Sequence, residues 1–211
     1  QERSRILLFV HYNRRDKLSD HALYTLTALR PHFNTVYVVS NSPLPSEEME
    51  ALRRVADNVR SRENRGFDFS AWKSEIHRIG WDRLERYDEL VLMNDTCFGP
   101  IRELEPVFAE MSSRECDFWG LTAHPPMAAS GDRRATPYHL QSYFLAFNQQ
   151  VVRAPEFREY WNNLEPLTDV EEVIFRYEVG LTNTLVGAGF RPDSYIAATL
   201  KEGDRPDAAT W

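Results

Sequence analysis

The stretch Tyr87–Pro100, YDELVLMNDTCFGP, predicts a strand that ends in a row of small polar residues. Its centre, Leu90–Met93, is a short apolar run bounded by turn-forming residues, which is typical of a buried β-strand. The run stops at Asn94, Asp95 and Thr96. Open α/β sheets bind ligands at the carboxyl ends of their strands, and a buried carboxylate requires a partner. Asp95 is therefore either a ligand-binding residue or the cap of the following turn.

Three apolar runs before this strand have the composition of further buried strands. They are Arg5–Val10, Thr35–Ser40 and a short extended piece around Val59. Between them the alternation of strand and helix predicts an α/β fold, a Rossmann-type, mainly parallel sheet with helices on both faces. The helices are indicated by apolar residues at helical spacing: Leu18, Ala22, Leu26 and Leu29, then Met49, Leu52 and Ala56, then Phe69, Trp72, Ile76 and Ile79.

Polar residues follow each of the four predicted strands. Because the carboxyl ends of parallel strands lie at one edge of a sheet, we expect these residues to form a single ligand site. Gly66 permits a close backbone approach, and the helix that it precedes has an amino terminus that attracts anions such as phosphate. Asp68 belongs to this site or is the helix N-cap. The full set is His11, Tyr12, Asn13, Ser40, Asn41, Asn64, Gly66, Asp68, Asn94 and Asp95.

The second half of the chain is less regular, and its long loop from Thr122 to Tyr138 is expected to be functional or mobile. Within that loop, Arg133 and Arg134 could close over a diphosphate or could simply be solvated. His139 and Gln141 could bind sugar hydroxyls or occupy an ordinary turn. Strands are predicted at Asp117–Leu121 and Ser142–Asn148, and helices at Pro106–Met111, from Pro155 onward, and over Val170–Leu185.

Glu178 is the candidate general base. In the last predicted helix it lies beside the apolar stripe of Ile174, Leu181 and Leu185, at the edge of the buried face. A carboxylate in that position suits proton abstraction. The alternative is a boundary glutamate that pairs with an arginine, such as Arg176 or Arg191.

Composition indicates one globular domain of 211 residues, with 42% hydrophobic and 27% charged residues. The net charge of −7 argues against a nucleic-acid partner. No apolar run approaches the roughly 20 residues of a transmembrane helix.

Cys97 and Cys116 have no metal-site spacing and are expected to be reduced thiols. The chain starts at Gln1, so we expect a domain cut from a longer protein. It contains no Gly-x-Ser-x-Gly, Walker A or Gly-x-Gly-x-x-Gly motif.

Five motifs in order resemble the rhamnan synthesis protein F family of bacterial polysaccharide glycosyltransferases. The resemblance runs from about Ile6 to Phe190, and more distantly the chain is similar to inverting GT-A-type glycosyltransferases. It implies a GT-A-like fold whose first strands hold the nucleotide sugar, with Ser40 and Asn41 at the nucleobase and Asn64 and Gly66 under the diphosphate. The motifs are NRGFDFSAWK, YDELVLMNDTCFGP, DFWGLT, HLQSYFLAF and YEVGLTNTLVGAGF.

The resemblance also places the catalytic base at Glu178, followed by Leu181, Gly189 and Phe190 at the family offsets. Two positions depart from the pattern. Asn94-Asp95-Thr96 replaces the Asp-x-Asp that holds a divalent cation, so a requirement for Mg²⁺ or Mn²⁺ at Asp95 stays open. Tyr177 replaces the acidic residue that usually precedes the base.

The expected function is transfer of a sugar, with inversion, from a nucleotide-sugar donor to a saccharide. The family resemblance suggests rhamnose from dTDP-rhamnose, and a lipid-linked saccharide acceptor of a cell-surface polysaccharide or lipopolysaccharide at the cytoplasmic face of the bacterial membrane. Residues 1–100 would form the nucleotide-binding half, and 101–211 the acceptor-binding half with the base. The alternatives are a non-catalytic saccharide- or nucleotide-binding module, and a sugar hydrolase that uses Asp95 and Glu178.

Overall fold

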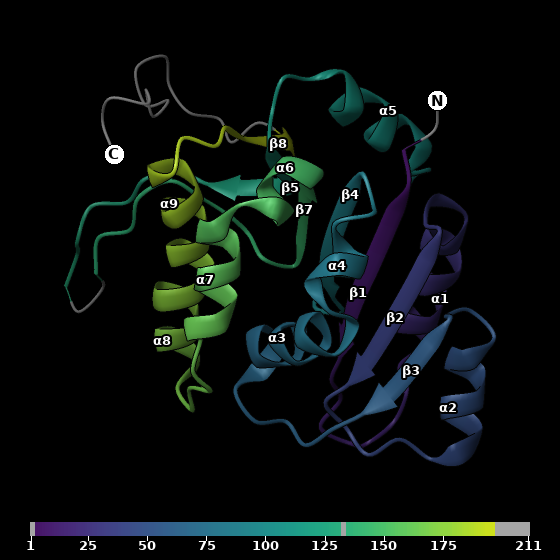
Figure 1. Ribbon diagram of the computed structural model, residues 1–211. Helices are drawn as coiled ribbons and strands as arrows, with labels where there is room; N and C mark the ends of the chain where they lie inside the picture. The colour runs from purple at the N-terminus through teal and green to yellow at the C-terminus, as the bar shows by residue number, and fades with distance from the viewer. Residues whose placement is uncertain (1–2, 132–133, 197–211) are drawn as a thin grey trace.

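An eight-stranded sheet forms the centre of the computed structural model, which describes residues 3–131 and 134–196 (Figure 1). The strand order is β3-β2-β1-β4-β7-β5-β6, and β8 pairs with β5. Strands β3, β2, β1 and β4 are parallel to one another, whereas β7 runs antiparallel to β4 and β5. The strands are β1 Arg5–His11, β2 Thr35–Ser40, β3 Asn58–Ser61, β4 Glu89–Asn94, β5 Phe118–His124, β6 His139–Leu140, β7 Phe144–Asn148 and β8 Pro192–Ile196.

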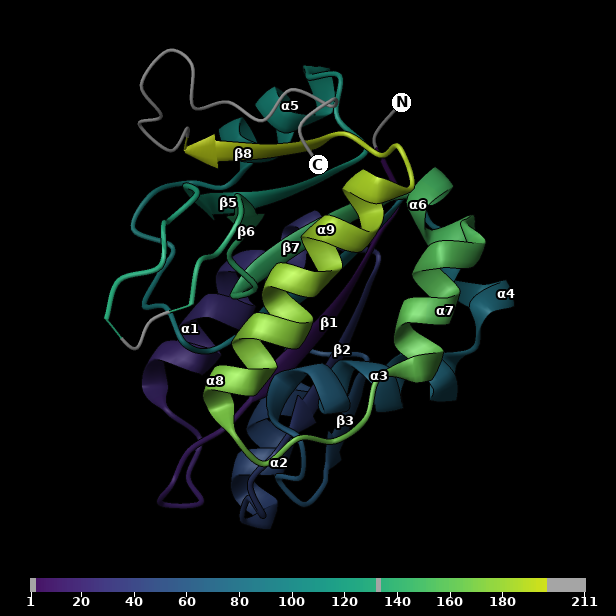
Figure 2. The same cartoon turned by 90° about the vertical axis from the view of Figure 1, so that its left-hand side faces the viewer.

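Helices cover both faces of this sheet, so the predicted α/β fold is confirmed (Figures 1 and 2). One face packs against α1, α2 and α5, and the other against α3, α7, α8 and α9. The helices are α1 Asp20–Leu29, η1 Arg30–His32, α2 Ser46–Arg53, α3 Phe67–Ile79, α4 Trp81–Leu84, α5 Glu105–Ser113, α6 Gln149–Arg153, α7 Pro155–Asn163, α8 Val170–Val173, η2 Ile174–Val179 and α9 Gly180–Gly187. No helix within the described residues is both long and apolar enough to cross a bilayer.

Strand β1 is the most deeply buried element, and its seven residues are all buried. Leu7 and Phe9 pack toward α1, while Ile6, Leu8 and Val10 pack toward α3. Side chains of successive strand residues point to opposite faces, so an uninterrupted apolar run such as Ile6–Val10 suits a strand covered on both sides. Trp72 of α3 adds a hydrogen bond from Nε1 to the Leu8 carbonyl at 3.1 Å.

The last predicted helix differs from a regular α-helix. Its middle third, η2, has π-helical geometry, which inserts an extra residue into the turn and rotates the residues that follow. Val170 and Ile174, which lie before and at the start of η2 and which the 3.6-residue period places in the core, are 54% and 45% exposed. Tyr177, Leu181 and Leu185 remain buried against α3 and α7.

Gly66, the N-cap of α3, occupies a position that other residues would strain. Its φ is +78°, and a Cβ there would overlap Ser70 Oγ and come within 2.8 Å of the Cα of Pro166, in the loop between α7 and α8. The glycine therefore permits this loop to pack directly on the start of α3.

Substitution of Gly66 by alanine is expected to lower the free energy of unfolding by about 2 kcal/mol or more, because a left-handed conformation and a steric overlap add together. Gly180→Ala is the matched control, since Gly180 is helical and a Cβ there meets nothing within 4 Å. That change should be neutral or stabilise by up to about 1 kcal/mol. Urea unfolding of both variants measures the difference, and equal effects would contradict the assignment.

Candidate active site

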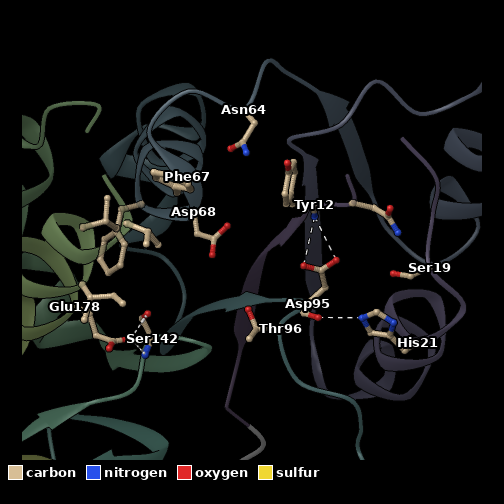
Figure 3. A pocket seen from close by; sticks show the side chains of 15 residues that line it. Tyr12, Ser19, His21, Asn64, Phe67, Asp68, Asp95, Thr96, Ser142 and Glu178 are labelled. Carbon is tan, nitrogen blue, oxygen red and sulfur yellow. Dashed lines mark hydrogen bonds between the residues drawn. The ribbon is translucent and has the colours of Figure 1, made fainter. Parts of the chain in front are cut away.

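A pocket of about 330 Å³ lies at the carboxyl ends of β1 and β4. This is the switch point of the sheet, because the chain continues from β1 to β2 on one side while β4 lies on the other, and ligands of open α/β sheets bind there. Figure 3 shows Glu178 and Ser142 on one side of the pocket and Tyr12, Asp95 and His21 on the other. The lining residues are Tyr12, Asn13, Ser19, His21, Asn64, Phe67, Asp68, Phe69, Asp95, Thr96, Ser142, Val170, Val173, Ile174 and Glu178.

Asp95 is fixed by the residue that follows β1. The Tyr12 N–H lies 3.4 Å from Asp95 Oδ1 and 3.3 Å from Oδ2, and His21 Nε2 lies 3.0 Å from the Asp95 carbonyl oxygen. Burial raises the pKa of the Asp95 carboxyl to about 6, and the charge of Asp68 adds to the rise. The Tyr12 N–H opposes it.

The amino terminus of α3 contributes Asp68 to the pocket. Gly66 is the N-cap, so Asp68 does not cap the helix; its Oδ2 accepts a 2.8 Å hydrogen bond from Asn94 Nδ2. Burial raises the pKa of the Asp68 carboxyl to about 6, against the opposing effect of the Asn94 amide. Asn64 lies beside Asp68 on the pocket wall, and its buried Oδ1 has no hydrogen-bond partner within the described residues. Buried polar atoms usually have a hydrogen-bond partner, so this oxygen on the pocket wall is a candidate contact for an N–H or O–H group of a ligand.

Glu178 enters the pocket from η2. Its Oε2 accepts hydrogen bonds from the Ser142 N–H at 2.7 Å and from Ser142 Oγ at 2.5 Å. The carboxylate is thus held by the turn before β7 and does not pair with Arg176 or Arg191. π-helical turns are often found at functional sites, because they redirect a side chain that a regular helix would place elsewhere. Here the turn directs Glu178 toward the same pocket as Asp95 and Asn64.

An apolar wall faces the polar strand ends. Val170, Val173 and Ile174 line the pocket from α8 and η2, and Phe67 lines it from α3. The pocket therefore combines carboxylates, an amide and a helix amino terminus with an apolar surface. Such a lining fits an amphipathic ligand or a pair of ligands that differ in polarity.

The sequence-predicted residues divide into three groups by position. Tyr12, Asn13, Asn64, Asp68, Asp95 and Glu178 line the pocket. Behind the lining are His11, Ser40, Asn41, Gly66 and Asn94, all buried. Their contacts fix the lining: His11 Nδ1 lies 2.9 Å from Ser40 Oγ, and Asn41 Nδ2 donates to the Phe67 carbonyl at 3.3 Å.

The third group was expected to bind sugar or diphosphate but does not line the pocket. His139 is buried behind Glu178, and Gln141 Oε1 accepts from Thr122 Oγ1 at 2.7 Å. Arg134 pairs with Glu172 at 2.7 Å and lies over the Phe175 ring, because its loop packs against α8 and η2. Arg133 lies outside the described residues.

The donor set around Asp95 does not fit a cation held by protein ligands alone. Within residues 3–131 and 134–196, no three His, Cys, Asp or Glu side chains converge to hold a metal ion. The Asn94 amide is already used, since Nδ2 donates to Asp68 and Oδ1 accepts the Thr96 N–H at 3.1 Å. Mg²⁺ and Mn²⁺ sites of this kind would need oxygens from a ligand.

The family model described as rhamnan synthesis protein F matches residues 36–210. The chain belongs to the rhamnan synthesis protein F family. This match confirms the family expected from the five sequence motifs. It begins in β2, so β1 with Tyr12 and Asn13 precedes the matched region of this family member.

Two known proteins resemble this rhamnan synthesis protein F family member. The uncharacterized protein y4gN of Sinorhizobium fredii (strain NBRC 101917 / NGR234) is 26% identical over 162 residues, which cover 77% of the chain and 41% of y4gN. The chain thus spans about two-fifths of the length of this curated relative. The crystal structure of a 4-diphosphocytidyl-2C-methyl-D-erythritol synthase has a TM-score of 0.53 at 14% identity, covering 94% and 93% of the two chains. That likeness concerns the fold alone.

Sequence reasoning missed Ser142 and His21, which fix Glu178 and Asp95. Ser142 belongs to the HLQS motif, in which the sequence favours His139 and Gln141 because imidazole and amide groups can hydrogen-bond sugar hydroxyls. In the turn after β6, the Gln141 side chain is hydrogen-bonded to Thr122, away from the pocket. It is the Ser142 side chain that faces the pocket and is hydrogen-bonded to Glu178. His21 carries a weaker signal, since it is one of several polar residues at the start of α1.

The two raised carboxyl pKa values have a consequence for the stability of this family member. The folded-state pKa of Asp68, about 6, exceeds the ordinary aspartate pKa of 3.8, so its contribution to stability is full below about pH 4 and is lost as the pH rises through 6. Asp68→Asn should therefore raise the free energy of unfolding at pH 8 by up to about 2 kcal/mol, once solvent screening is allowed for.

Thermal unfolding at pH 8 and pH 4.5 tests this, and the gain should shrink at the lower pH. Asp82→Asn is the control, because Asp82 is exposed on α4 and such changes stay within about 0.5 kcal/mol. A loss of stability in Asp68→Asn at pH 8 would show that the carboxylate stabilises the fold.

Proposed function

We propose that the pocket is the active site of an inverting glycosyltransferase that uses a nucleotide-sugar donor. The observation that carries the proposal is the position of Glu178: one carboxylate, held by Ser142, shares a pocket with the amino terminus of α3 and the ends of β1 and β4. Displacement of a diphosphate requires a base for the acceptor hydroxyl and a group that binds the departing anion. Glu178 and the amino terminus of α3 bring these two parts to one cavity. Membership of the rhamnan synthesis protein F family supports the same reading.

The reaction is a single displacement. Glu178 takes the proton from an acceptor hydroxyl, whose oxygen forms a bond to the anomeric carbon of the donor sugar. The bond from that carbon to the diphosphate oxygen breaks, and its electron pair leaves on the diphosphate. The proton that left the acceptor remains on Glu178 until product release. Attack from the side opposite the leaving group inverts the anomeric configuration.

The helix amino terminus supplies part of the compensation for the departing diphosphate. The first backbone N–H groups of α3 have no partner within the helix, and Phe67, Asp68 and Phe69 of its first turn line the pocket beside Asn64. Such groups bind phosphate, aided by the helix dipole. Asp68 lies close by and opposes an anion when it is ionised, which favours binding of the diphosphate when Asp68 holds a proton.

The identity of donor and acceptor extends the proposal. The family name supports rhamnose, carried on dTDP, as the donor sugar. A solved protein of the same fold is a synthase of a diphosphocytidyl compound, which is consistent with a nucleoside diphosphate in this pocket. The apolar wall of Val170, Val173 and Ile174 suits a lipid-linked saccharide acceptor, and such an acceptor places the reaction at the cytoplasmic face of the bacterial membrane.

A second candidate is a saccharide- or nucleotide-binding module without turnover. The donor set around Asp95 favours it, because Asn94 is committed to Asp68 and Thr96. Glu178 argues against it, since binding alone has no need for a carboxylate held by two donors from a distant turn. The two candidates differ in turnover and agree in nucleotide binding.

Glu178→Gln separates them. A transferase should lose about 10²–10⁴-fold in kcat, because the amide keeps the shape of the side chain but cannot accept the proton. Donor affinity should stay unchanged, measured by the thermal shift with dTDP-, UDP- and GDP-sugars; a ligand at 100 times its Kd adds about 2.7 kcal/mol of stability. The same screen with and without Mn²⁺ reports whether donor phosphates complete a cation shell.

Glu171→Gln is the control, since it removes one exposed carboxylate one turn before η2 and should leave kcat unchanged. Nucleotide-sugar binding without any turnover in the wild-type chain supports the binding module. Turnover that survives in Glu178→Gln would reject Glu178 as the base.

A further inference from the structure

Behind Glu178 lies a buried imidazole that the displacement does not itself use. His139 Nε2 is 3.7 Å from Glu178 Oε1, and the residue is 4% exposed. Strand β6 fixes it: His139 pairs with His124 of β5, and the N–H of Leu140 donates to Thr182 Oγ1 of α9 at 3.1 Å. The ring also stacks on that of His124, with centroids 5.2 Å apart and planes 8° from parallel.

The contacts of His139 determine which of its nitrogens carries hydrogen. Nδ1 lies 2.9 Å from the Pro137 carbonyl oxygen. A carbonyl oxygen only accepts, so Nδ1 donates and carries the hydrogen. In the neutral ring Nε2 therefore carries a lone pair and no hydrogen, and it faces the carboxylate oxygen Oε1 of Glu178. Two acceptors that face each other attract only when a proton lies between them.

The two oxygens of the Glu178 carboxylate have different hydrogen-bond partners. Both hydrogen bonds from Ser142 go to Glu178 Oε2 (Figure 3). Oε1 has no hydrogen-bond donor among the described residues, and its neighbour is the lone pair of His139. The carboxylate is thus divided between one oxygen that two donors hold and one oxygen that is left to receive a proton.

We propose that Glu178 and His139 act as a proton-sharing pair, in which His139 is the positioning residue for the base. This rests on the proposed role of Glu178. The O–H bond of the acceptor breaks, its proton binds Glu178 Oε1, and that carboxyl group then donates a hydrogen bond to the lone pair of His139 Nε2. On product release the proton returns to solvent, and both groups regain their starting states.

Two ionisable groups act on the imidazole, Glu178 from η2 and His124 from β5. Burial lowers the pKa of His139, the charge of His124 lowers it further, and the charge of Glu178 raises it. The ring is therefore kept neutral with its lone pair available, and protonation of the glutamate removes the charge that raises the pKa of His139. A purely structural histidine at this position would need only the bond to Pro137 and the packing on His124.

Histidine NMR tests the pair without any assay of transfer. In ¹⁵N-labelled wild-type protein, His139 should show the Nδ1–H tautomer, and its pKa should fall in Glu178→Gln, because the charge that raises it is removed. Glu171→Gln should leave that pKa in place. An Nε2–H tautomer, or a His139 pKa that is the same in wild type and Glu178→Gln, would overturn the inference, whatever the transferase activity proves to be.

His139→Gln gives the second test. The glutamine amide can contact Glu178 Oε1 but cannot share its proton, so kcat should fall about tenfold or more, with the donor KM unchanged and the acidic limb of the kcat–pH profile displaced. His77→Gln, an exposed change on α3, should alter neither. A normal kcat and pH profile in His139→Gln, beside an inactive Glu178→Gln, would overturn the inference and leave the proposed function intact. If Glu178→Gln stays active, the proposed function fails, and the NMR result stands separately.

Discussion

The parallel pairing of β1 with β4 is the contact on which the pocket depends. Their register aligns Val10 with Asn94. The residues that follow the two strands, Tyr12 after β1 and Asp95 after β4, therefore lie close together and meet through the Tyr12 N–H. Because both faces of β1 are packed, neither strand can shift without exposing apolar side chains. The position of Asp95 is thus fixed by the core of the protein and not by the loop that carries it.

The two buried carboxylates of the pocket lower the free energy of unfolding, and the packing of the rest of the fold offsets this loss. Asp68 and Asp95 both have raised pKa values because burial disfavours their charged forms, and the charge of Asp68 raises the pKa of Asp95 further. Neither carboxylate pairs with an arginine or lysine in the described structure. Groups that weaken the fold where they stand are expected at sites under functional selection, since a stabilising pair would occupy the donors and acceptors that a ligand needs.

The wall opposite Asp95 depends on a break in helix regularity. The regular 3.6-residue period predicts Ile174 in the core and Glu178 at the margin of the core. The π-helical turn instead turns Ile174 and Glu178 to the pocket while Tyr177 and Leu181 stay in the core. One segment thus supplies the carboxylate of Glu178, the apolar surface of Ile174 and the packing contact of Tyr177.

The sequence by itself determined the alternation of strands and helices, the parallel first half and the polar residues at the strand ends. These features depend on local periodicity and on where apolar runs stop, which neighbouring residues encode. Only the tertiary structure decided what each side chain contacts: Glu178 meets Ser142, 36 residues away, and Asn94 turns to Asp68, 26 residues away. His139 likewise lies behind Glu178 because β6 pairs with β5. Such partners depend on the packing of distant segments, and no local pattern of residues specifies them.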